Sequence, residues 1–437
     1  MTARRAALKA LAAYRRNNAW PGLVLSKTDL PAREMALAKQ IVNGVLQNMT
    51  LCDYYATHYS AKSLKKLEPG VLDILRISIY QIVFLEKVPN SAAVNEGVVL
   101  AKKSSPYAVG FVNAVLRKVA DAAANGALPE VVGETQYQIN SIKYSHPEWL
   151  AWTLSDIISQ DIERLLIANN SSKTPVTAQV NTLIADTDEV LASLRAAGVR
   201  AEPHEWLDGC IEMYGAGGVD RLDAFIKGQI YIQDAAARLA VIAAGPKPGD
   251  FVIDGCAAPG GKAFAAAIAM KNTGRIAAFD IHASKLRRIE EGAARLGISI
   301  ITIHEGDASI HSEKYARKAD VVLADVPCSG FGVIRKRPEI RYKSERDIAG
   351  LPDVQLRILS NLSSYVNPGG TLLYSTCTVL KRENEGVIAA FLHGNDEFYP
   401  EDFSLPGAGG STDGMLTLWP HIHGTDGFFI CKLRRQA

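Results

Sequence analysis

The 437-residue sequence predicts a multidomain protein in which an all-α bundle precedes a small α+β unit and a doubly wound, Rossmann-like α/β domain. Apolar residues recur at helical spacing through residues 3–122, and strand-then-helix segments repeat from residue 236. A chain of this length forms two or three domains. We expect domains at 1–128, 149–235 and 236–437, with a linker over 129–148.

The amino-terminal region predicts a bundle of about six helices. Prolines separate its periodic stretches, and one stretch has apolar residues at Leu72, Leu75, Ile79 and Ile82. Residues 1–130 hold 17 Lys and Arg against 9 Asp and Glu, although the whole chain carries a net charge of only +2. This imbalance indicates a polyanionic partner such as nucleic acid. A solvated basic surface is the alternative, and charge alone does not decide between them.

The two later regions differ in how strands and helices alternate. A helix over 149–167 is followed by strands at 176–180 and 229–232, which is typical of a small α+β unit. The third region has expected strands at 251–254, 275–280, 299–303, 320–325, 371–375 and 427–433. Helical stretches lie between these strands and predict a parallel sheet with an antiparallel end.

Composition excludes several classes of protein. Apolar residues make up 48% and charged residues 22% of the chain, as in soluble globular proteins. No uncharged apolar run approaches the ~20 residues that span a bilayer, and no signal peptide pattern is present. The six cysteines are scattered without paired spacing, which argues against a disulfide framework and a zinc site. We therefore expect a protein of the reducing cytoplasm, with no membrane partner and no metal.

A turn of small residues follows the strand at 251–254 and precedes a helix, as in nucleotide-binding sheets. Its residues are Cys256, Ala257, Ala258, Pro259, Gly260, Gly261 and Lys262. Asp280 ends the next strand, where a carboxylate accepts hydrogen bonds from ribose hydroxyls, and Asp307 follows the third strand. Each acid has an alternative role as a helix N-cap. The turn lacks both the dinucleotide and the phosphate-loop glycine patterns, so S-adenosylmethionine is the cofactor that fits better.

Two cysteines are candidates for nucleophilic chemistry. Cys328 and Cys377 each follow a predicted strand end, and in an open parallel sheet these ends face one crevice. The remaining thiols, in Cys52, Cys210, Cys256 and Cys431, are expected to pack as small hydrophobes. A run of cations follows Cys328, namely Arg335, Lys336, Arg337, Arg341, Lys343 and Arg346. This run predicts either a solvated basic loop or a clamp for phosphates.

A thiolate has a specific use in methyl transfer to cytosine. Carbon 5 of cytosine is too electron-poor to attack a methyl sulfonium, and addition of a thiolate at carbon 6 makes it nucleophilic. Asp325, three residues before Cys328, could stabilise the adduct near ring nitrogen 3. This chemistry needs one cysteine, a second could assist elimination, and spacing alone does not say which is which.

These motifs resemble the RNA 5-methylcytosine methyltransferases, in particular those that act on bacterial 16S rRNA. The resemblance rests on residues 254–262, on Asp325-Val326-Pro327-Cys328-Ser329-Gly330 and on Ser375-Thr376-Cys377-Thr378. The helical region is similar to the NusB-type RNA-binding fold at residues 72–77, 93–98 and 110–118. The resemblance implies that Cys377 is the nucleophile and Cys328 promotes release. It also implies cofactor contacts from residues 256–262, Asp280, Asp307 and Asp325, the last lying close to the base.

Two other functions share parts of this pattern. An NAD-dependent oxidoreductase would use the sheet and Asp280 but has no role for two strand-end thiols. A non-catalytic RNA-binding or antitermination factor would account for residues 1–130 alone. Within the methyltransferase interpretation, tRNA or 23S rRNA is the alternative substrate to a small-subunit rRNA hairpin. A monomer is the expected oligomeric state.

Overall fold

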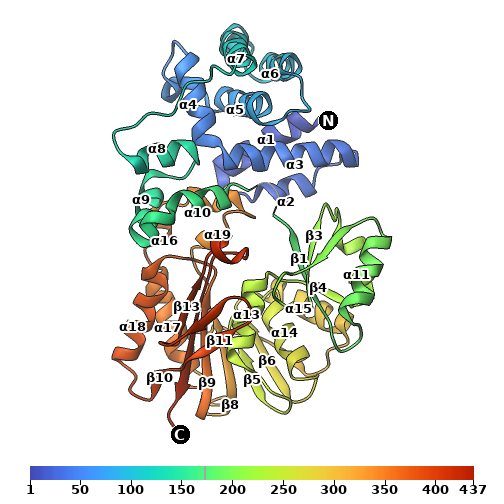
Figure 1. The fold of residues 1–437 in the computed structure, drawn as a ribbon, viewed down its shortest axis with the longest axis vertical. Coiled ribbons are helices and arrows are strands. Elements are labelled where there is room, and N and C mark those ends of the chain that lie inside the picture. The colour runs from blue at the N-terminus through green and yellow to red at the C-terminus, as the bar shows by residue number, and fades with distance from the viewer. Residues whose placement is uncertain (172–173) are drawn as a thin grey trace. The chain divides into compact units, whose positions relative to one another are not determined.

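The computed structural model describes residues 1–171 and 174–437. The chain forms two compact units, which we call unit 1 and unit 2 (Figure 1). Unit 1 comprises Met1–Ser172 together with Arg337–Tyr342, and unit 2 comprises Lys173–Lys336 together with Lys343–Ala437. Among the described helices, none has the length and apolar character needed to cross a membrane.

Unit 1 is helical. Its α-helices are α1 (Ala3–Asn17), α2 (Pro21–Ser26), α3 (Ala32–Gln47), α4 (Met49–Tyr59), α5 (Pro69–Phe84), α6 (Asn90–Ser104), α7 (Val109–Ala124), α8 (Gln136–Lys143), α9 (Glu148–Ile158) and α10 (Ile162–Asn169). Short 3-10 helices lie at Leu64–Lys66, Pro106–Ala108, Ser159–Asp161 and Pro338–Tyr342. Seven of the α-helices lie within residues 3–124, where the sequence predicts about six. The all-α bundle is confirmed.

Helix α5 is the centre of this bundle. It begins at Pro69, whose ring suits the first helical turn, and Ile74, Leu75, Ile77 and Ile79 are fully buried. Asp73 on the same helix is also buried, and its carboxylate pairs with Arg15 at 2.8 Å and with Arg76 at 3.4 Å. A buried charge is tolerated where it is paired in this way. The apolar face of α5 therefore holds the surrounding helices together.

The segment expected as a linker contains structure of its own. Helix α8 lies within residues 129–148 and begins at an N-cap, because the Thr135 hydroxyl accepts a hydrogen bond from the Gln138 N–H. The predicted helix over 149–167 is divided into α9 and α10 by a 3-10 turn, and both pack within unit 1. The domain boundaries at 128, 148 and 235 stay predictions.

The first part of unit 2 is a small antiparallel sheet. Its elements are β1 (Val176–Val180), α11 (Thr187–Ala196), β2 (Arg200–Pro203), β3 (Cys210–Tyr214), a 3-10 turn (Val219–Arg221), α12 (Asp223–Ile226) and β4 (Ile230–Ile232). The strand order is β2-β3-β1-β4. Asn181, at the end of β1, donates to the carbonyls of Gly228 at 3.0 Å and Leu296 at 2.8 Å. This buried amide links the small sheet to the end of helix α15 (Ala283–Leu296).

The larger sheet has the order β10-β14-β9-β8-β5-β6-β7, with β13 paired to β14. Its elements are α13 (Ala235–Ala244), β5 (Phe251–Asp254), α14 (Gly261–Ala269), β6 (Arg275–Asp280), α15 (Ala283–Leu296), β7 (Ile301–Glu305), β8 (Ala319–Asp325), α16 (Glu345–Ile348), α17 (Leu351–Ser363), β9 (Val366–Thr376), α18 (Glu385–His393), β10 (Phe398–Pro400), β13 (Met415–Leu418), α19 (Pro420–His423) and β14 (Phe428–Arg435). A separate pair is β11 (Phe403–Leu405) with β12 (Gly409–Ser411), and 3-10 turns lie at Phe331–Val333 and Lys381–Glu383. Strands β5 to β9 are parallel and β14 is antiparallel to β9, which confirms the doubly wound sheet with an antiparallel end.

Helices cover both faces of this sheet (Figure 1). On β5, Val252 faces the core built with α13, α14 and α15, whereas Phe251 and Ile253 face the core built with α17 and α18. This alternation follows from the two-residue period of a strand. The carboxyl ends of β5, β6, β7, β8 and β9 then meet at one edge, where an α/β sheet binds its ligands.

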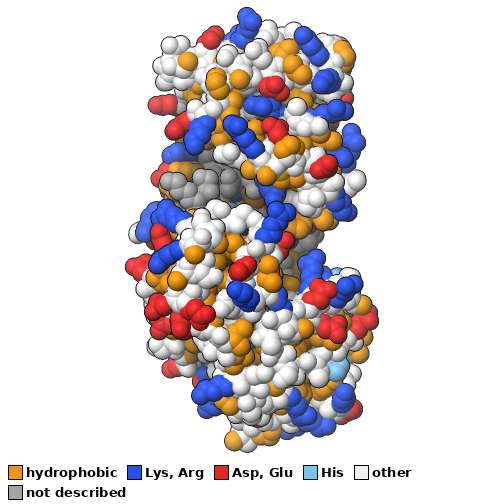
Figure 2. Space-filling model, turned by 90° about the vertical axis from the view of Figure 1, so that its right-hand side faces the viewer, with side chains coloured by type: hydrophobic (Ala, Val, Ile, Leu, Met, Phe, Trp, Pro, Cys, Tyr) orange, Lys and Arg blue, Asp and Glu red, His pale blue; other side chains and the backbone are white. Residues whose placement is uncertain are grey.

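Charge differs between the units as the sequence indicates. Figure 2 shows basic side chains, Lys and Arg, and acidic side chains, Asp and Glu, interspersed over the surface. Residues 1–130, which lie in unit 1, carry the excess of 17 basic over 9 acidic residues.

Candidate active site

The turn after β5 requires a glycine at position 260. Gly260 has a φ of +111°, and a Cβ there would lie 2.5 Å from the Phe264 ring. Its N–H donates to the Ala257 carbonyl at 2.7 Å, and the Ala257 N–H donates to the Phe279 carbonyl at 2.7 Å. The turn is therefore tied to β6 while α14 begins at Gly261 with its first N–H groups free of helix partners. This arrangement suits the close approach of a ligand.

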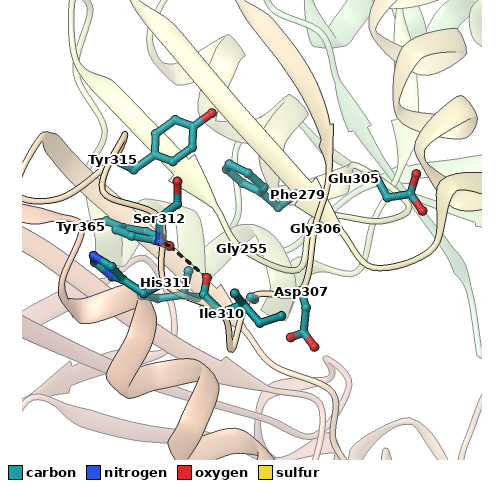
Figure 3. A pocket seen from close by; sticks show the side chains of 12 residues that line it. Gly255, Phe279, Glu305, Gly306, Asp307, Ile310, His311, Ser312, Tyr315 and Tyr365 are labelled. Atoms are coloured by element: carbon teal, nitrogen blue, oxygen red, sulfur yellow. Dashed lines mark hydrogen bonds between the residues drawn. The ribbon is translucent and has the colours of Figure 1, made fainter.

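A cavity of about 330 Å³ opens beside this turn. Figure 3 shows Gly255 and Gly306 in the middle of its lining, with the Tyr315 and Phe279 rings on one side and Asp307 on the other. An aromatic wall next to two glycines and a carboxylate provides a flat apolar surface and a hydrogen-bond acceptor. Such a lining fits an adenine ring better than a phosphate group.

Both predicted cofactor acids cap turns, and each does so with one oxygen. Oδ1 of Asp280 accepts from the His282 N–H at 2.9 Å. Oδ1 of Asp307 accepts from the Ser309 N–H at 2.8 Å and its hydroxyl at 2.7 Å, and the hydroxyl bond lowers the pKa of Asp307. Among the described residues, Oδ2 of each carboxylate accepts no hydrogen bond. The capping role and a ligand-binding role are thus compatible for both acids.

The two candidate thiols lie next to each other. The Sγ atoms of Cys328, after β8, and Cys377, after β9, are 3.2 Å apart, and both residues are partly exposed. The Gly332 N–H donates to the Cys377 carbonyl at 3.0 Å, which joins the two turns through their backbones. The structure therefore brings together the two cysteines that the sequence singles out.

The environments of the two thiols differ in charge. The hydrogen bond between the two sulfurs lowers the pKa of Cys377, and the Lys262 cation also lowers it, whereas burial and the Asp325 carboxylate oppose this shift. The same hydrogen bond, together with burial, raises the pKa of Cys328 well above its usual range. Because only a thiolate is a good nucleophile, this difference in pKa agrees with the expectation that Cys377 is the nucleophile.

The nearly buried Lys262 and the partly exposed Asp325 form an ion pair beside the thiols. Lys262 Nζ lies 2.7 Å from Asp325 Oδ2 and 5.1 Å from the centre of the Phe428 ring. Asp325 Oδ1 accepts from the Ser375 hydroxyl at 2.8 Å. The pair places a cation from the turn after β5 against a carboxylate at the end of β8.

Two further titratable groups lie at the end of β5 and in the turn that follows it. Asp254 is fully buried, and burial raises its pKa to about 7. Burial also raises the pKa of Cys256 above its usual range, which agrees with a packing role. Cys52, Cys210 and Cys431 are buried, as predicted.

The cation run after Cys328 is neither a solvated loop nor a phosphate clamp at most of its positions. Arg335 pairs with Asp426 at 2.7 Å, and Lys336 pairs with both Asp426, at 3.0 Å, and Asp234. Arg337 pairs with Glu339 at 3.2 Å. Carboxylates distant in the sequence thus neutralise Arg335 and Lys336, and no periodic pattern reveals such partners, whereas the partner of Arg337 lies two residues away.

Arg341 of the same run is fully buried in unit 1. Its guanidinium donates to the carbonyls of Gln47 at 3.2 Å, Tyr144 at 3.1 Å and Asn169 at 3.2 Å, and to Oδ1 of Asn170 at 2.7 Å. Burial lowers its pKa to about 10. Arg341 is therefore a structural residue that holds the segment Arg337–Tyr342 in the helical unit.

Three polar residues around the thiols have no counterpart in the sequence analysis. Gln355 on α17 and the adjacent Glu383 and Asn384 before α18 are fully or almost fully buried and bond to the cysteine turns. In the sequence, Glu383 and Asn384 are two polar residues directly before an apolar helix. Such a pair predicts only the start of that helix and gives no sign of a contact with the cysteines.

Comparison with known proteins agrees with this geometry. Residues 241–434 match the family described as 16S rRNA methyltransferase RsmB/F, residues 1–121 match the NusB family, and residues 146–220 match an RsmF/B-like ferredoxin-like domain. The chain is 35% identical to a probable ribosomal RNA small subunit methyltransferase B of Bacillus subtilis (strain 168), over 99% of this chain and 98% of that protein. It is 29% identical to ribosomal RNA small subunit methyltransferase B of Escherichia coli O6:H1, over 92% and 91% respectively.

A solved structure shows the same architecture in part. The chain is 27% identical to a methyltransferase homologue from Pyrococcus horikoshii, with a TM-score of 0.59 over 68% of this chain and 97% of that one. The three predicted components, a NusB-like bundle, a small α+β unit and a Rossmann-like methyltransferase domain, are confirmed. The chain belongs to the 16S rRNA methyltransferase RsmB/F family.

Proposed function

We propose that this methyltransferase transfers a methyl group from S-adenosylmethionine to carbon 5 of a cytosine in 16S rRNA through a transient bond to Cys377. The observation that carries the proposal is the 3.2 Å approach of the Cys328 and Cys377 sulfurs beside the Lys262–Asp325 pair. The names of the relatives support a small-subunit rRNA substrate. The NusB-like unit, with its basic charge, supports RNA binding.

The turn after β5 and the adjacent cavity fit S-adenosylmethionine. The backbone of residues 256–262 would approach the cofactor closely, because glycine at position 260 has no side chain to keep a ligand away. Oδ2 of Asp280 would accept from ribose hydroxyls, and Asp307 with the Phe279 ring would hold the adenine. When bound, the cofactor supplies an electrophilic methyl group on a sulfonium.

The residues at the strand ends would perform the remaining steps. The Cys377 thiolate adds to carbon 6 of the cytosine, and its electron pair makes carbon 5 nucleophilic. Ring nitrogen 3 takes up a proton from water as the adduct forms, and Asp325, partly exposed and close to Lys262, would accept a hydrogen bond from that N–H and stabilise the adduct. After carbon 5 is methylated, its proton passes to solvent water, and the electrons of that C–H bond reform the ring double bond and expel the Cys377 thiolate.

The different thiol environments support different roles. Cys377 has the lowered pKa and would attack, whereas Cys328 has the raised pKa and remains a thiol. Cys328 is therefore placed to take part in the release step, in which the carbon 5 proton leaves and the adduct breaks down.

The test compares two single variants on 16S rRNA with methyl-labelled S-adenosylmethionine. Cys377→Ala should abolish label transfer, because no adduct forms, and Cys328→Ala should accumulate protein bound covalently to RNA on a denaturing gel. Exchanged phenotypes would reverse the two roles. Mapping of 5-methylcytosine after reaction with 16S rRNA, 23S rRNA and tRNA separates the proposed substrate from the alternatives.

A further inference from the structure

Glu383 is a fully buried carboxylate close to the thiols. Its Oε2 accepts from the Ser329 N–H at 2.8 Å and from Gln355 Nε2 at 2.9 Å. Ser329 directly follows Cys328 in the chain. A charge-assisted hydrogen bond in a water-free setting holds its partner more firmly than a neutral one. The backbone on one side of Cys328 is therefore held by Glu383.

Gln355 holds the other side of the same cysteine. Its Nε2 donates to the Pro327 carbonyl at 3.0 Å in addition to Glu383. Pro327 precedes Cys328, so the Gln355–Glu383 pair contacts the residue before and the residue after the thiol. Both side chains are fully buried, and their geometry is consequently fixed by packing.

Asn384 holds the second cysteine in the same manner. Its Oδ1 accepts from the Thr376 hydroxyl at 2.6 Å, and its Nδ2 donates to the Thr378 carbonyl at 3.1 Å. These two threonines flank Cys377 in the chain. The adjacent residues Glu383 and Asn384 thus connect to the turns of the two different thiols.

We propose that Glu383 and Asn384, assisted by Gln355, are positioning residues that set the approach of the Cys328 and Cys377 sulfurs to 3.2 Å. Residues 383 and 384 share a peptide bond, so a displacement of one cysteine turn relative to the other strains the hydrogen bonds of both. The expected effect of these hydrogen bonds on methyl transfer rests on the proposed function, whereas their expected effect on the distance between the two sulfurs does not.

The carboxylate has a second effect, on protonation. The hydrogen bond to Cys377 and burial raise the pKa of Cys328, and the negative charge of Glu383 raises it further. A neutral residue at position 383 would weaken the difference between the two thiols. Glu383 therefore helps to keep Cys328 as the hydrogen-bond donor of the pair.

The test measures thiol geometry directly, in the full-length protein without RNA. Diamide oxidises two adjacent thiols to a disulfide and is itself reduced to the hydrazine, and peptide mapping identifies a Cys328–Cys377 bond. We expect Glu383→Ala and Asn384→Ala to form this bond at least about ten-fold more slowly than the unmodified protein, because misplacement by about 1 Å costs rate steeply. Glu383→Gln keeps an oxygen for the Ser329 N–H and should remain within about three-fold.

The matched control is Glu385→Ala. Glu385 lies two residues from Glu383, and among the described residues its carboxylate accepts no hydrogen bond from either cysteine turn. Its oxidation rate should equal that of the unmodified protein. An equally slow Glu385→Ala would show a general loosening of this segment and would overturn the proposal.

Methyl transfer provides a second readout. Glu383→Ala should lower kcat by about a hundred-fold and leave KM for RNA and for S-adenosylmethionine within two-fold, because the residue contacts neither ligand. A folded Glu383→Ala that oxidises at the normal rate would refute the positioning role. If Glu383→Ala does not fold, Gln355→Met takes its place, because methionine keeps the side-chain volume and removes the hydrogen bonds to Pro327 and Glu383. A normal oxidation rate of folded Gln355→Met would then refute the positioning role.

The two proposals fail in different ways. Slow disulfide formation in the variants of a protein that never methylates RNA would support the positioning role and refute the proposed function. If all the folded variants oxidise at the normal rate and the unmodified protein methylates cytosine in 16S rRNA, the proposed function is supported and the positioning role is refuted.

Discussion

Lys262 Nζ lies 2.7 Å from Asp325 Oδ2, so that a nearly buried ammonium connects the turn after β5 to the end of β8. The same ammonium lowers the pKa of the Cys377 thiol. One lysine therefore acts on the carboxylate that we propose to face the base and on the sulfur that we propose as the nucleophile. This relationship leads to the first prediction.

Lys262→Met should make Cys377 less reactive. Loss of the cation raises the pKa of the thiol, so the pH midpoint of Cys377 alkylation by iodoacetamide should move upward. Because alkylation needs the thiolate, its rate increases as pH rises through that midpoint. The measurement is peptide-resolved alkylation between pH 6 and pH 10, with the exposed Lys285→Met as control. An unmoved midpoint would refute the electrostatic role of Lys262.

Asp254→Asn should change how stability depends on pH. The folded pKa of Asp254, about 7, is above the unfolded value of about 3.9, so its protonated form is favoured by folding. Protonated Asp254 makes its full contribution to the free energy of unfolding below about pH 4. This contribution of about 4 kcal/mol is lost as pH rises to about 7. The variant should lack this decline in urea unfolding at pH 5 and pH 8. Exposed Asp396→Asn should retain it.

Arg341→Met should destabilise unit 1. The substitution keeps much of the side-chain volume but removes the Arg341 donor from the Gln47 and Asn169 carbonyls and from Asn170 Oδ1, which costs about 3 kcal/mol or more. Thermal and urea unfolding measure the loss. Arg346→Met, at an exposed position of the same run of cations, should unfold like the unmodified protein. Equal stability of the two variants would contradict the structural role of the Arg341 hydrogen bonds.

Gly260→Ala should weaken cofactor binding. Its Cβ would lie 2.5 Å from the Phe264 ring at a φ that disfavours side chains, so the turn must shift. We expect the Kd for S-adenosylmethionine in calorimetry to rise at least about ten-fold, since a loss of about 1.4 kcal/mol suffices. Gly249→Ala is the matched control, because Gly249 also has a positive φ but nothing within 4 Å of a Cβ. Unaltered binding by Gly260→Ala would show that the turn does not contact the cofactor.

Local pattern predicted much of the catalytic sheet. The apolar runs of β5 and β6 match their observed bounds, because buried parallel strands are continuous and end at turn residues. Strand β9 begins at Val366, five residues before the predicted start at 371, since Pro368 and two glycines follow and obscure the strand pattern. Strand β7 begins at Ile301, two residues later than predicted.

The contacts that hold the site were beyond prediction, because their partners are distant in the sequence. Glu383 bonds to Ser329 across 54 positions, and Arg341 bonds to Gln47 across 294. A run of six cations indicates an exposed basic loop when its neighbours are unknown. The proximity of the two cysteines, by contrast, followed from the rule that parallel strands end at one edge.

The six residues Arg337–Tyr342 pack with the helices, although the chain before and after them builds the methyltransferase sheet. Neither unit is therefore a continuous stretch of polypeptide, and no single cut in the coding sequence releases either one whole. A truncated protein that stops at residue 172 would expose to water the carbonyl groups that Arg341 covers. A fusion of the helical unit to another enzyme would therefore also have to include residues Arg337–Tyr342.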